Sequence, residues 1–184
     1  MGKESEFPVV NFFCGCIFRE AEMYEEAKDV LARLFSALDC ESAEFPFTAT
    51  SYYDEEMGRP LFRRFFSFTE LREPDILPDM KIETNRVEEE SAAGDKRRIN
   101  LDPGYLSLAN VVIATTKNYT HRIPLRRGIY AHLEYVFQRQ RLTPLAWTYP
   151  DFRTPSYIDF FCDLRMRYKR KLDESGRFRR PLGG

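Results

Sequence analysis

The sequence predicts an α+β fold in which helices pack on a mainly antiparallel sheet. Three observations predict it: a continuous apolar run at 9–18, an amphipathic helical pattern directly after it, and two β-type segments at 43–53 and 61–68 with a turn between them. A second helical pattern and another strand follow, so the order is β-α-β-β-α-β. This is the order of a split βαβ, ferredoxin-like unit, to which further strands and a C-terminal helix are added.

The first half of the chain supplies the elements of that unit. Residues 9–18 form a run of mainly apolar, β-type residues, as in a central strand. Residues 19–39 repeat apolar side chains at helical spacing, with charged residues on the other face. Residues 43–53 alternate apolar and polar side chains, and the turn at 56–60 joins them to the Phe-rich run 61–68 as a hairpin. A second helix is expected from Pro74 or Pro78 to about Ala93, with Gly94 just past its end.

The second half is predicted to consist mostly of strands. Strand-type sequence occupies 98–102, 109–116, 121–137 and 142–149, and a closing helix is expected at 155–171. After the first of these strands, Asp102, Pro103 and Gly104 are the residue types of a tight turn. No Gly-, Ser- or Pro-rich linker divides the chain, so we expect a single domain over residues 1–172 and a disordered basic tail over 173–184.

Composition limits the function classes. The chain has 28 Lys and Arg against 29 Asp and Glu, so its overall charge attracts neither nucleic acid nor an anionic membrane. A nucleic acid partner is not favoured, although local binding stays open. The longest apolar runs are far shorter than the roughly 20 residues that span a bilayer, and the N-terminus lacks a signal-peptide pattern, so we expect a cytoplasmic protein. Cys14 and Cys16 lie in an apolar run and are predicted to be buried hydrophobes rather than metal ligands.

Unusual polar residues gather in short runs at the ends of the predicted strands. Each run combines carboxylates, cations, amides or phenols, which is the chemistry of a ligand site rather than of interchangeable turns. The runs lie at 52–58, 98–105, 115–122 and 147–151.

The segment around Arg122 alternates along its length. Every second residue places one polar set on one face, and the apolar residues between them on the other. A solvated outer face is the plain interpretation. The functional one is a cationic cleft, in which arginine binds phosphate or carboxylate and His121 or His132 exchanges a proton. The polar set consists of Arg122, Arg126, Tyr130, His132 and Glu134.

Two further polar sets carry the same two interpretations. Lys81, Asn85 and Glu88 recur at helical spacing and form one polar stripe, which is either a solvent-exposed helix face or part of a site. Arg98, Asn100 and Asp102 alternate onto one face of the strand that leads into the predicted turn. Turn chemistry alone explains Asp102, but the same carboxylate can also face a cleft.

Six motifs between Val9 and about Tyr168 carry a family resemblance. Their combination resembles an uncharacterised prokaryotic family called domain of unknown function 4416, to which no reaction is assigned. The motifs are Tyr52-Tyr53-Asp54-Glu55-Glu56-Met57-Gly58, Thr84-Asn85 with Glu88, Arg98-Ile99-Asn100-Leu101-Asp102-Pro103-Gly104-Tyr105, Ala114-Thr115-Thr116-Lys117 with His121-Arg122, Gly128-Ile129-Tyr130, and Trp147-Thr148-Tyr149-Pro150-Asp151.

Some members of that family carry the label GTP-binding protein, and the sequence argues against copying it. A P-loop needs G-x-x-x-x-G-K-[ST] after a strand, which neither the segment at Gly15 nor that at Gly94 provides. Lys117 lacks the flanking Asn and Asp of a guanine-recognition element. The templates G-x-S-x-G, H-E-x-x-H and G-x-G-x-x-G are also missing. A nucleotide held by another arrangement stays open.

Our hypothesis is a polar cleft at the strand ends that binds a small ligand bearing a phosphate or carboxylate, with nucleotide or phosphoester chemistry as the candidate reaction. Arg122, Lys117 and Arg98 would neutralise the anion, and Mg²⁺ is a candidate cofactor. His121, Asp102 and Glu56 are the candidate catalytic residues: His121 for proton transfer, the two carboxylates to orient a metal, water or hydroxyl. The candidate binding residues are Tyr52, Tyr53, Lys81, Asn85, Glu88, Arg98, Asn100, Lys117, Arg122, Tyr130, Tyr149 and Asp151.

The alternative is a non-catalytic binding module. Its aromatic residues would form an open platform for single-stranded RNA or a protein partner, because bases stack on aromatic faces beside cations. The position of the rings separates the two hypotheses: a platform needs them on an open sheet face, and a small-ligand site needs them around a pocket. The rings are Tyr52, Tyr53, Tyr105, Tyr149 and Trp147.

Overall fold

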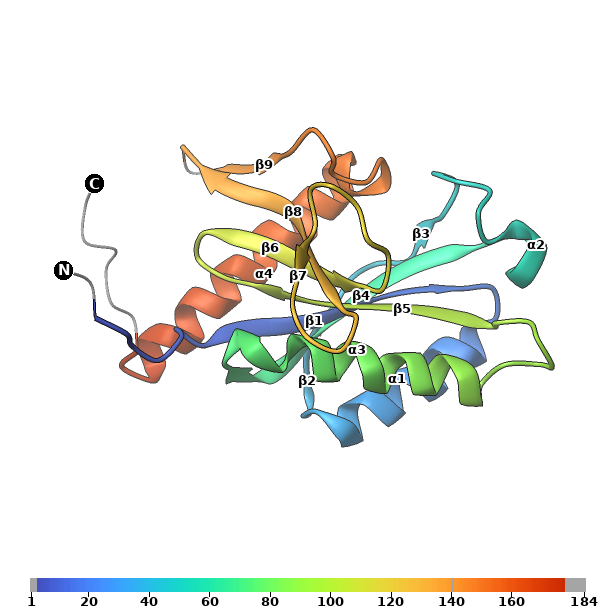
Figure 1. The fold of residues 1–184 in the computed structure, drawn as a ribbon, viewed down its shortest axis with the longest axis horizontal. Helices are drawn as coiled ribbons and strands as arrows, with labels where there is room; N and C mark the ends of the chain where they lie inside the picture. The colour runs from blue at the N-terminus through green and yellow to red at the C-terminus, as the bar shows by residue number, and fades with distance from the viewer. Residues whose placement is uncertain (1–2, 140, 178–184) are drawn as a thin grey trace.

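The structure is a computed structural model that describes residues 3–139 and 141–177. In these residues a nine-stranded antiparallel sheet carries the helices α1 to α4 (Figure 1), so the predicted α+β class is confirmed. The elements are β1 Val10–Phe18, α1 Ala21–Leu34, β2 Leu38–Glu41, β3 Phe45–Pro46, α2 Asp54–Met57, β4 Phe62–Arg72, η1 Pro74–Ile76, α3 Leu77–Glu90, β5 Ile99–Leu106, β6 Asn110–Thr115, β7 Ile123–Pro124, β8 Tyr130–Gln138, β9 Arg141–Pro144, η2 Asp151–Arg153 and α4 Pro155–Glu174.

The first part of the sheet has the predicted ferredoxin-like beginning. Its strand order is β2-β4-β1-β5, with each neighbouring pair antiparallel, and α1 and α3 make the two crossovers. The short elements β3 and α2 are inserted between β2 and β4. Beyond β5 the sheet continues through β6, β8 and β7, while β9 pairs with β8.

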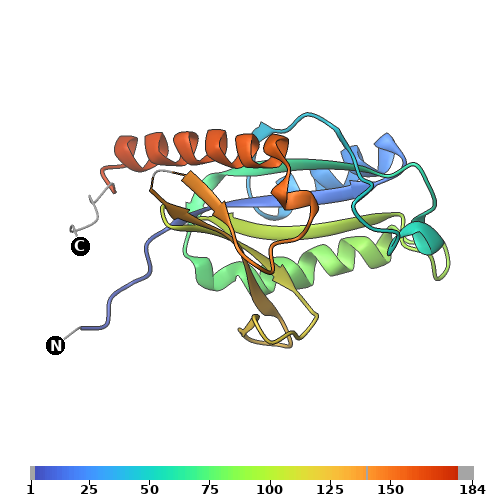
Figure 2. The same cartoon turned by 90° about the horizontal axis from the view of Figure 1, so that it is seen from above.

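Helices cover both faces of the sheet, and the side chains of β1 alternate between them. Phe12, Cys14 and Phe18 belong to the core between the sheet and the helices α1 and α3, which lie below the strands in Figure 1. Phe13 points to the other face and packs against α4, which Figure 2 shows running alongside the strands. All of β1 is buried, and Cys14 and Cys16 are buried as predicted.

Several predicted boundaries differ from the structure. The first helix ends at Leu34 because the next residues turn into β2. The strand predicted at 43–53 shrinks to β3, since residues 48–52 are exposed and leave the sheet. At the other end, α4 reaches Glu174, two residues into the predicted tail, and residues 178–184 of that tail lie outside the described part. None of the described helices has the length and apolar composition needed to cross a membrane.

The single strand predicted at 121–137 is wrong. The segment is a hairpin of β7 and β8, with positive φ at Arg127 (58°) and Gly128 (77°), and Figure 2 shows it projecting beyond α3. Because the chain reverses there, one alternation cannot run through both strands. Ile123, assigned to the packed face, is 65% exposed, whereas His132 and Glu134, assigned to a polar face, are fully buried.

The tight turn predicted at Asp102, Pro103 and Gly104 is also wrong, because all three residues lie inside β5. β5 pairs with β1 along its whole length but with β6 only from Gly104 onward. The register that pairs Gly104 with Ile113 would next place Pro103 opposite Ala114. Proline has no N–H for that ladder, so the pairing stops and the two strands part.

Gly104 is the last paired residue before the strands part, and it needs to be glycine. A Cβ there would lie 2.5 Å from Phe13 Cζ and 2.5 Å from the Val112 carbonyl oxygen. β6 and the Phe13 ring can approach β5 this closely only where β5 has no side chain.

We predict that Gly104→Ala destabilises the protein by about 3 kcal/mol or more, because backbone on one side cannot move aside. Gly128→Ala is the control: it meets nothing within 4 Å and carries only the cost of a positive φ, about 1 kcal/mol. Urea unfolding measures both. Equal losses for the two variants would contradict the close approach at Gly104.

Candidate functional site

A cavity of about 570 Å³ lies where β5 and β6 part. Its wall is built from the segment after β3, from α3, from the first half of β5, from the end of β6 and from the residues around η2. Most of the predicted site residues line it. They are Tyr52, Tyr53, Lys81, Asn85, Glu88, Asn100, Asp102, Lys117, Tyr149 and Asp151.

Five predicted residues do not line this cavity. Glu56 and Arg98 line a second depression of about 440 Å³, formed around α2 and the loop before β5. His121, Arg122 and Tyr130 line neither of the two.

Sequence reasoning missed Arg63 and Arg97, which do line the main cavity. The sequence did contain a signal for Arg63. It lies two positions before Phe65 in a Phe-rich strand, so both side chains point to the same apolar face, and a cation on such a face needs a carboxylate partner.

Two side chains of α3 replace the missing strand pairing of β5. Lys81 Nζ donates to the Leu101 carbonyl oxygen at 2.6 Å, and Glu88 Oε1 accepts from the Leu101 N–H at 2.6 Å. Both side chains are buried, and burial raises the pKa of Glu88 even though Lys81 and the Leu101 N–H oppose the shift. An unpaired buried backbone group is costly, so this pair keeps the edge of β5 open without leaving its polar groups unsatisfied.

Arg63 crosses the base of the cavity as a buried guanidinium, with 4% of the residue exposed. Its space comes from Gly15 on the neighbouring strand, where a Cβ would lie 2.8 Å from Arg63 Nη1. Asp102 Oδ2 lies 3.3 Å from Nη1 and Asp151 Oδ2 lies 3.5 Å from Nη2. Burial lowers the pKa of Arg63, but the two carboxylates outweigh it and the net shift is upward. Burial raises the pKa of Asp151, against the opposing charge of Arg63.

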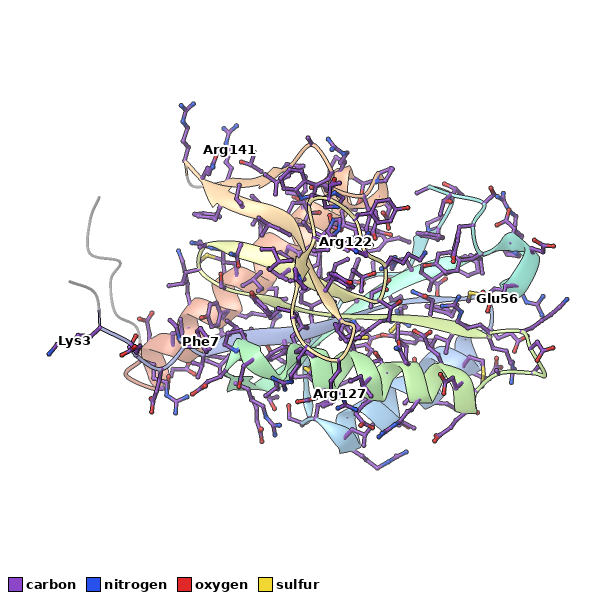
Figure 3. All side chains as sticks on the ribbon, in the orientation of Figure 1. Lys3, Phe7, Glu56, Arg122, Arg127 and Arg141 are labelled. Carbon is purple, nitrogen blue, oxygen red and sulfur yellow. The ribbon has the colours of Figure 1, made fainter. Side chains whose placement is uncertain are left out.

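A chain of polar contacts holds Asp102 in place. Asn100 Nδ2 donates to Asp102 Oδ2 at 3.0 Å, and Asn100 Oδ1 accepts from Arg97 Nη1 at 2.9 Å. Arg97 in turn binds both oxygens of Glu56 and one of Glu88, at 2.8 to 3.2 Å. Glu56 lies at the end of the sheet where α2 is (Figure 3), and it reaches the cavity only through Arg97.

The mouth of the cavity carries a different kind of cation. Lys117 Nζ lies 3.9 Å from the centre of the Tyr52 ring, which joins the segment after β6 to the segment after β3 by a cation–π contact. In the described part of the chain Lys117 forms no salt bridge, whereas Arg63, Lys81 and Arg97 each do. The hydroxyl-bearing residues Thr50, Thr115 and Thr116 line the wall beside it.

Arg122 lies behind the cavity wall, beside β8 (Figure 3), and it is 7% exposed. Its Nε donates to His132 Nδ1 at 3.1 Å, its Nη1 to the Lys117 carbonyl oxygen at 2.8 Å, and its Nη2 to the Tyr149 hydroxyl at 2.5 Å. All three nitrogens are therefore used inside the protein. Arg122 ties together two parts of the wall, Lys117 and Tyr149, and does not itself line the cavity.

His121 belongs to the same cluster. Its Nε2 lies 3.3 Å from His132 Nδ1, and its ring stacks on Trp147. Burial, His132 and the Arg122 charge lower the pKa of His121. Behind it, His132 stacks on Tyr149 and lies 3.2 Å from Glu134, whose other oxygen accepts from the Tyr149 N–H. The cluster supports the Tyr149 side of the cavity, and His121 does not reach the cavity itself.

No group of three or more His, Cys, Asp or Glu side chains in the described residues is arranged to hold a metal ion.

A family model described as Domain of unknown function (DUF4416) matches residues 8–168. The chain belongs to this family. No curated protein and no solved structure matches this chain. The family match includes every residue of the cavity wall, from Phe47 to Asp151.

We predict that Glu88→Ala destabilises the protein by about 2–3 kcal/mol, because it leaves the buried Leu101 N–H without an acceptor. Glu88→Gln keeps an oxygen at that position and should lose less. Both are measured by urea unfolding at pH 7. If the two variants lose the same amount, the hydrogen bond to Leu101 is not what Glu88 contributes.

A second prediction concerns the Glu56 and Arg97 pair. The hydrogen bonds from Arg97 lower the pKa of Glu56 below its ordinary value. The pair therefore stabilises the fold above the unfolded-state pKa of about 4.3, and this stability is lost as the pH falls through the lower folded-state pKa.

Glu56→Gln should cost on the order of 1 kcal/mol at pH 7 and much less near pH 2.5. Glu55→Gln is the control, since Glu55 is an exposed neighbour on α2. Urea unfolding across this pH range measures both, and a cost for Glu56→Gln that does not change with pH would exclude the ion pair as its source.

Proposed function

We propose that the cavity between β5 and β6 binds a small molecule bearing a phosphate or carboxylate group, with the anion at Lys117. The observation that carries the proposal is the difference between Lys117 and the other cations of the wall. Arg63, Lys81 and Arg97 already have carboxylate partners, while among the described residues Lys117 contacts the Tyr52 ring and forms no salt bridge. A cation–π partner leaves the ammonium free to bind an anion at the same time.

The charge and size of the cavity support this assignment. Its cations are Arg63, Lys81, Arg97 and Lys117, and its carboxylates are Glu88, Asp102 and Asp151. Glu56 adds a fourth carboxylate through Arg97, so the charges balance in number, and among the described residues Lys117 is the cation of the wall that forms no salt bridge. A volume of about 570 Å³ is in the range of pockets that enclose small molecules. The threonine hydroxyls near Lys117 add hydrogen-bond donors for anionic oxygens.

The position of the aromatic rings favours a pocket over an open platform. Tyr52, Tyr53 and Tyr149 line the cavity. Tyr105 packs on Phe12 in the core below the sheet, and Trp147 stacks on His121 and donates to the Leu133 carbonyl oxygen. The rings that a platform for single-stranded RNA would need are therefore divided among separate places.

Phosphoester or nucleotide chemistry is the reaction class we propose to test. Asp102 and Asp151 are the carboxylates that would orient a water or a ligand hydroxyl, and Mg²⁺ stays a candidate cofactor. His121 is not assigned a role in this proposal, since it lies behind the wall. The expected cytoplasmic location stays a prediction.

The proposal predicts that Lys117→Ala weakens anion binding about tenfold, as expected for one charge-assisted contact in a half-open site. Folding should stay intact, because Lys117 is exposed. Thermal-shift screening of inorganic phosphate, phosphate esters, nucleotides and dicarboxylates, with and without Mg²⁺, identifies the binders, and calorimetry then compares the dissociation constants.

Lys169→Ala is the matched control, since Lys169 lies on α4 and not on the cavity wall. It should bind like the unmodified protein. Anion binding that survives Lys117→Ala unchanged would refute the assignment of Lys117. Binding of single-stranded RNA, with no small anion bound at all, would favour the binding-module alternative.

A further inference from the structure

The base of the cavity holds polar atoms whose hydrogen-bonding capacity is not used. Among the described residues Arg63 Nε and Nη1 have no hydrogen-bond acceptor, and Asp151 Oδ2 has no donor. The carboxylates lie 3.3 and 3.5 Å from the guanidinium, which is beyond the roughly 2.7–2.9 Å of a charge-assisted hydrogen bond. Buried polar groups are normally satisfied, and these atoms belong to two residues that line the cavity, so the unsatisfied set points to a ligand.

The guanidinium is rigidly placed. It lies over Gly15, and the rings of Phe47, Phe65 and Phe152 surround it at 5.3, 5.5 and 5.7 Å from their centres. It cannot turn toward solvent without leaving this cage. Its unused N–H groups therefore keep fixed directions, which is what a specific binding site requires.

The charge of this set decides which ligand group fits it. Arg63, Asp102 and Asp151 together carry one excess negative charge, so a phosphate or carboxylate is opposed here, and an ammonium group is opposed by the guanidinium. A hydroxyl group suits both partners, because it accepts from an Arg63 N–H and donates to a carboxylate oxygen. One hydroxyl would accept from an Arg63 N–H and donate to Asp102, and a neighbouring hydroxyl would donate to Asp151.

Asp102 is prepared for this role. Its Oδ2 receives the amide of Asn100 and lies near Arg63, while no described residue donates a hydrogen bond to its Oδ1. The residue is partly exposed and lines the cavity, so its unused oxygen is open to a ligand.

We infer that the ligand carries neighbouring hydroxyl groups that bind between Asp102 and Asp151 on Arg63, opposite the anionic group at Lys117. This makes the substrate class sugar phosphates and nucleotides that keep their sugar hydroxyls. The inference rests on the proposed function for the anionic end, but its own evidence lies at the other end of the cavity.

The test compares pairs of ligands on the unmodified protein. Ribose 5-phosphate is paired with 2-deoxyribose 5-phosphate, and nucleoside monophosphates with their 2′-deoxy and 2′,3′-dideoxy forms, by calorimetry. The hydroxylated member should bind on the order of 10- to 100-fold more tightly, because a removed hydroxyl leaves charged groups unpaired. Equal binding within the pairs, or binding of hydroxyl-free dicarboxylates alone, would overturn the inference and leave the proposed function standing.

Variants then assign the preference to its residues. Asp102→Asn should reduce the preference for the hydroxylated member to about threefold or less, whereas Lys169→Ala should leave the preference unchanged. Lys117→Ala should weaken both members of each pair by the same factor and preserve the preference. Circular dichroism and unfolding confirm that each variant is folded, and Asp151→Asn repeats the test if Asp102→Asn is not.

The two proposals fail in different ways. Binding of ribose 5-phosphate that depends on Asp102 but not on Lys117 would support the hydroxyl site and refute the anion site. A preference that persists in both Asp102→Asn and Asp151→Asn would refute the hydroxyl site.

Discussion

Pro103 has no backbone N–H to give to β6, so the ladder between β5 and β6 stops at Gly104 and the two strands part. The Leu101 N–H and carbonyl then need other partners, which Glu88 and Lys81 of α3 supply. Asn100 and Asp102, on the alternate positions of the same strand, are left facing the gap. One missing donor thus opens the cavity, fixes α3 against its edge and exposes the polar face of β5.

The Arg63 ion cluster is hard to explain by stability alone. Burying a guanidinium removes its solvation free energy, and two carboxylates at 3.3 and 3.5 Å offset that loss only in part. A protein with an apolar side chain in place of a buried ion pair is often as stable or more stable. The chain nevertheless commits Gly15, an aromatic cage and two aspartates to it. Local choices that disagree with the most stable packing are found mainly where function requires them.

The sequence predicts the parts of this molecule that depend on local pattern and misses those that depend on contacts distant along the chain. Periodicity was enough for the ferredoxin-like beginning, and dense polar strand ends were enough to find most of the cavity wall. Pro103 has the residue type of a turn, and only pairing with β1 shows that it lies in a strand. Arg122 is of a residue type that binds anions, yet each of its three nitrogens donates a hydrogen bond inside the protein. The sequence pattern missed this because the hairpin of β7 and β8 reverses the chain. Whether a given cation forms a salt bridge depends on which carboxylates the tertiary structure places beside it, and a single sequence does not show this.

Arg122 gives the two ends of the cavity a common support. Its guanidinium holds the Lys117 carbonyl oxygen and the Tyr149 hydroxyl, and Tyr149 lies two residues before Asp151. The proposed anion site and the proposed hydroxyl site are therefore spaced by one buried cation as well as by the sheet. A planar guanidinium with every nitrogen bonded has little freedom to move, so the Lys117 backbone and the Tyr149 hydroxyl keep a fixed separation before any ligand binds. A ligand whose hydroxyls and anionic group lie at another separation would satisfy only one of them, which makes molecular length a selecting property of this cavity.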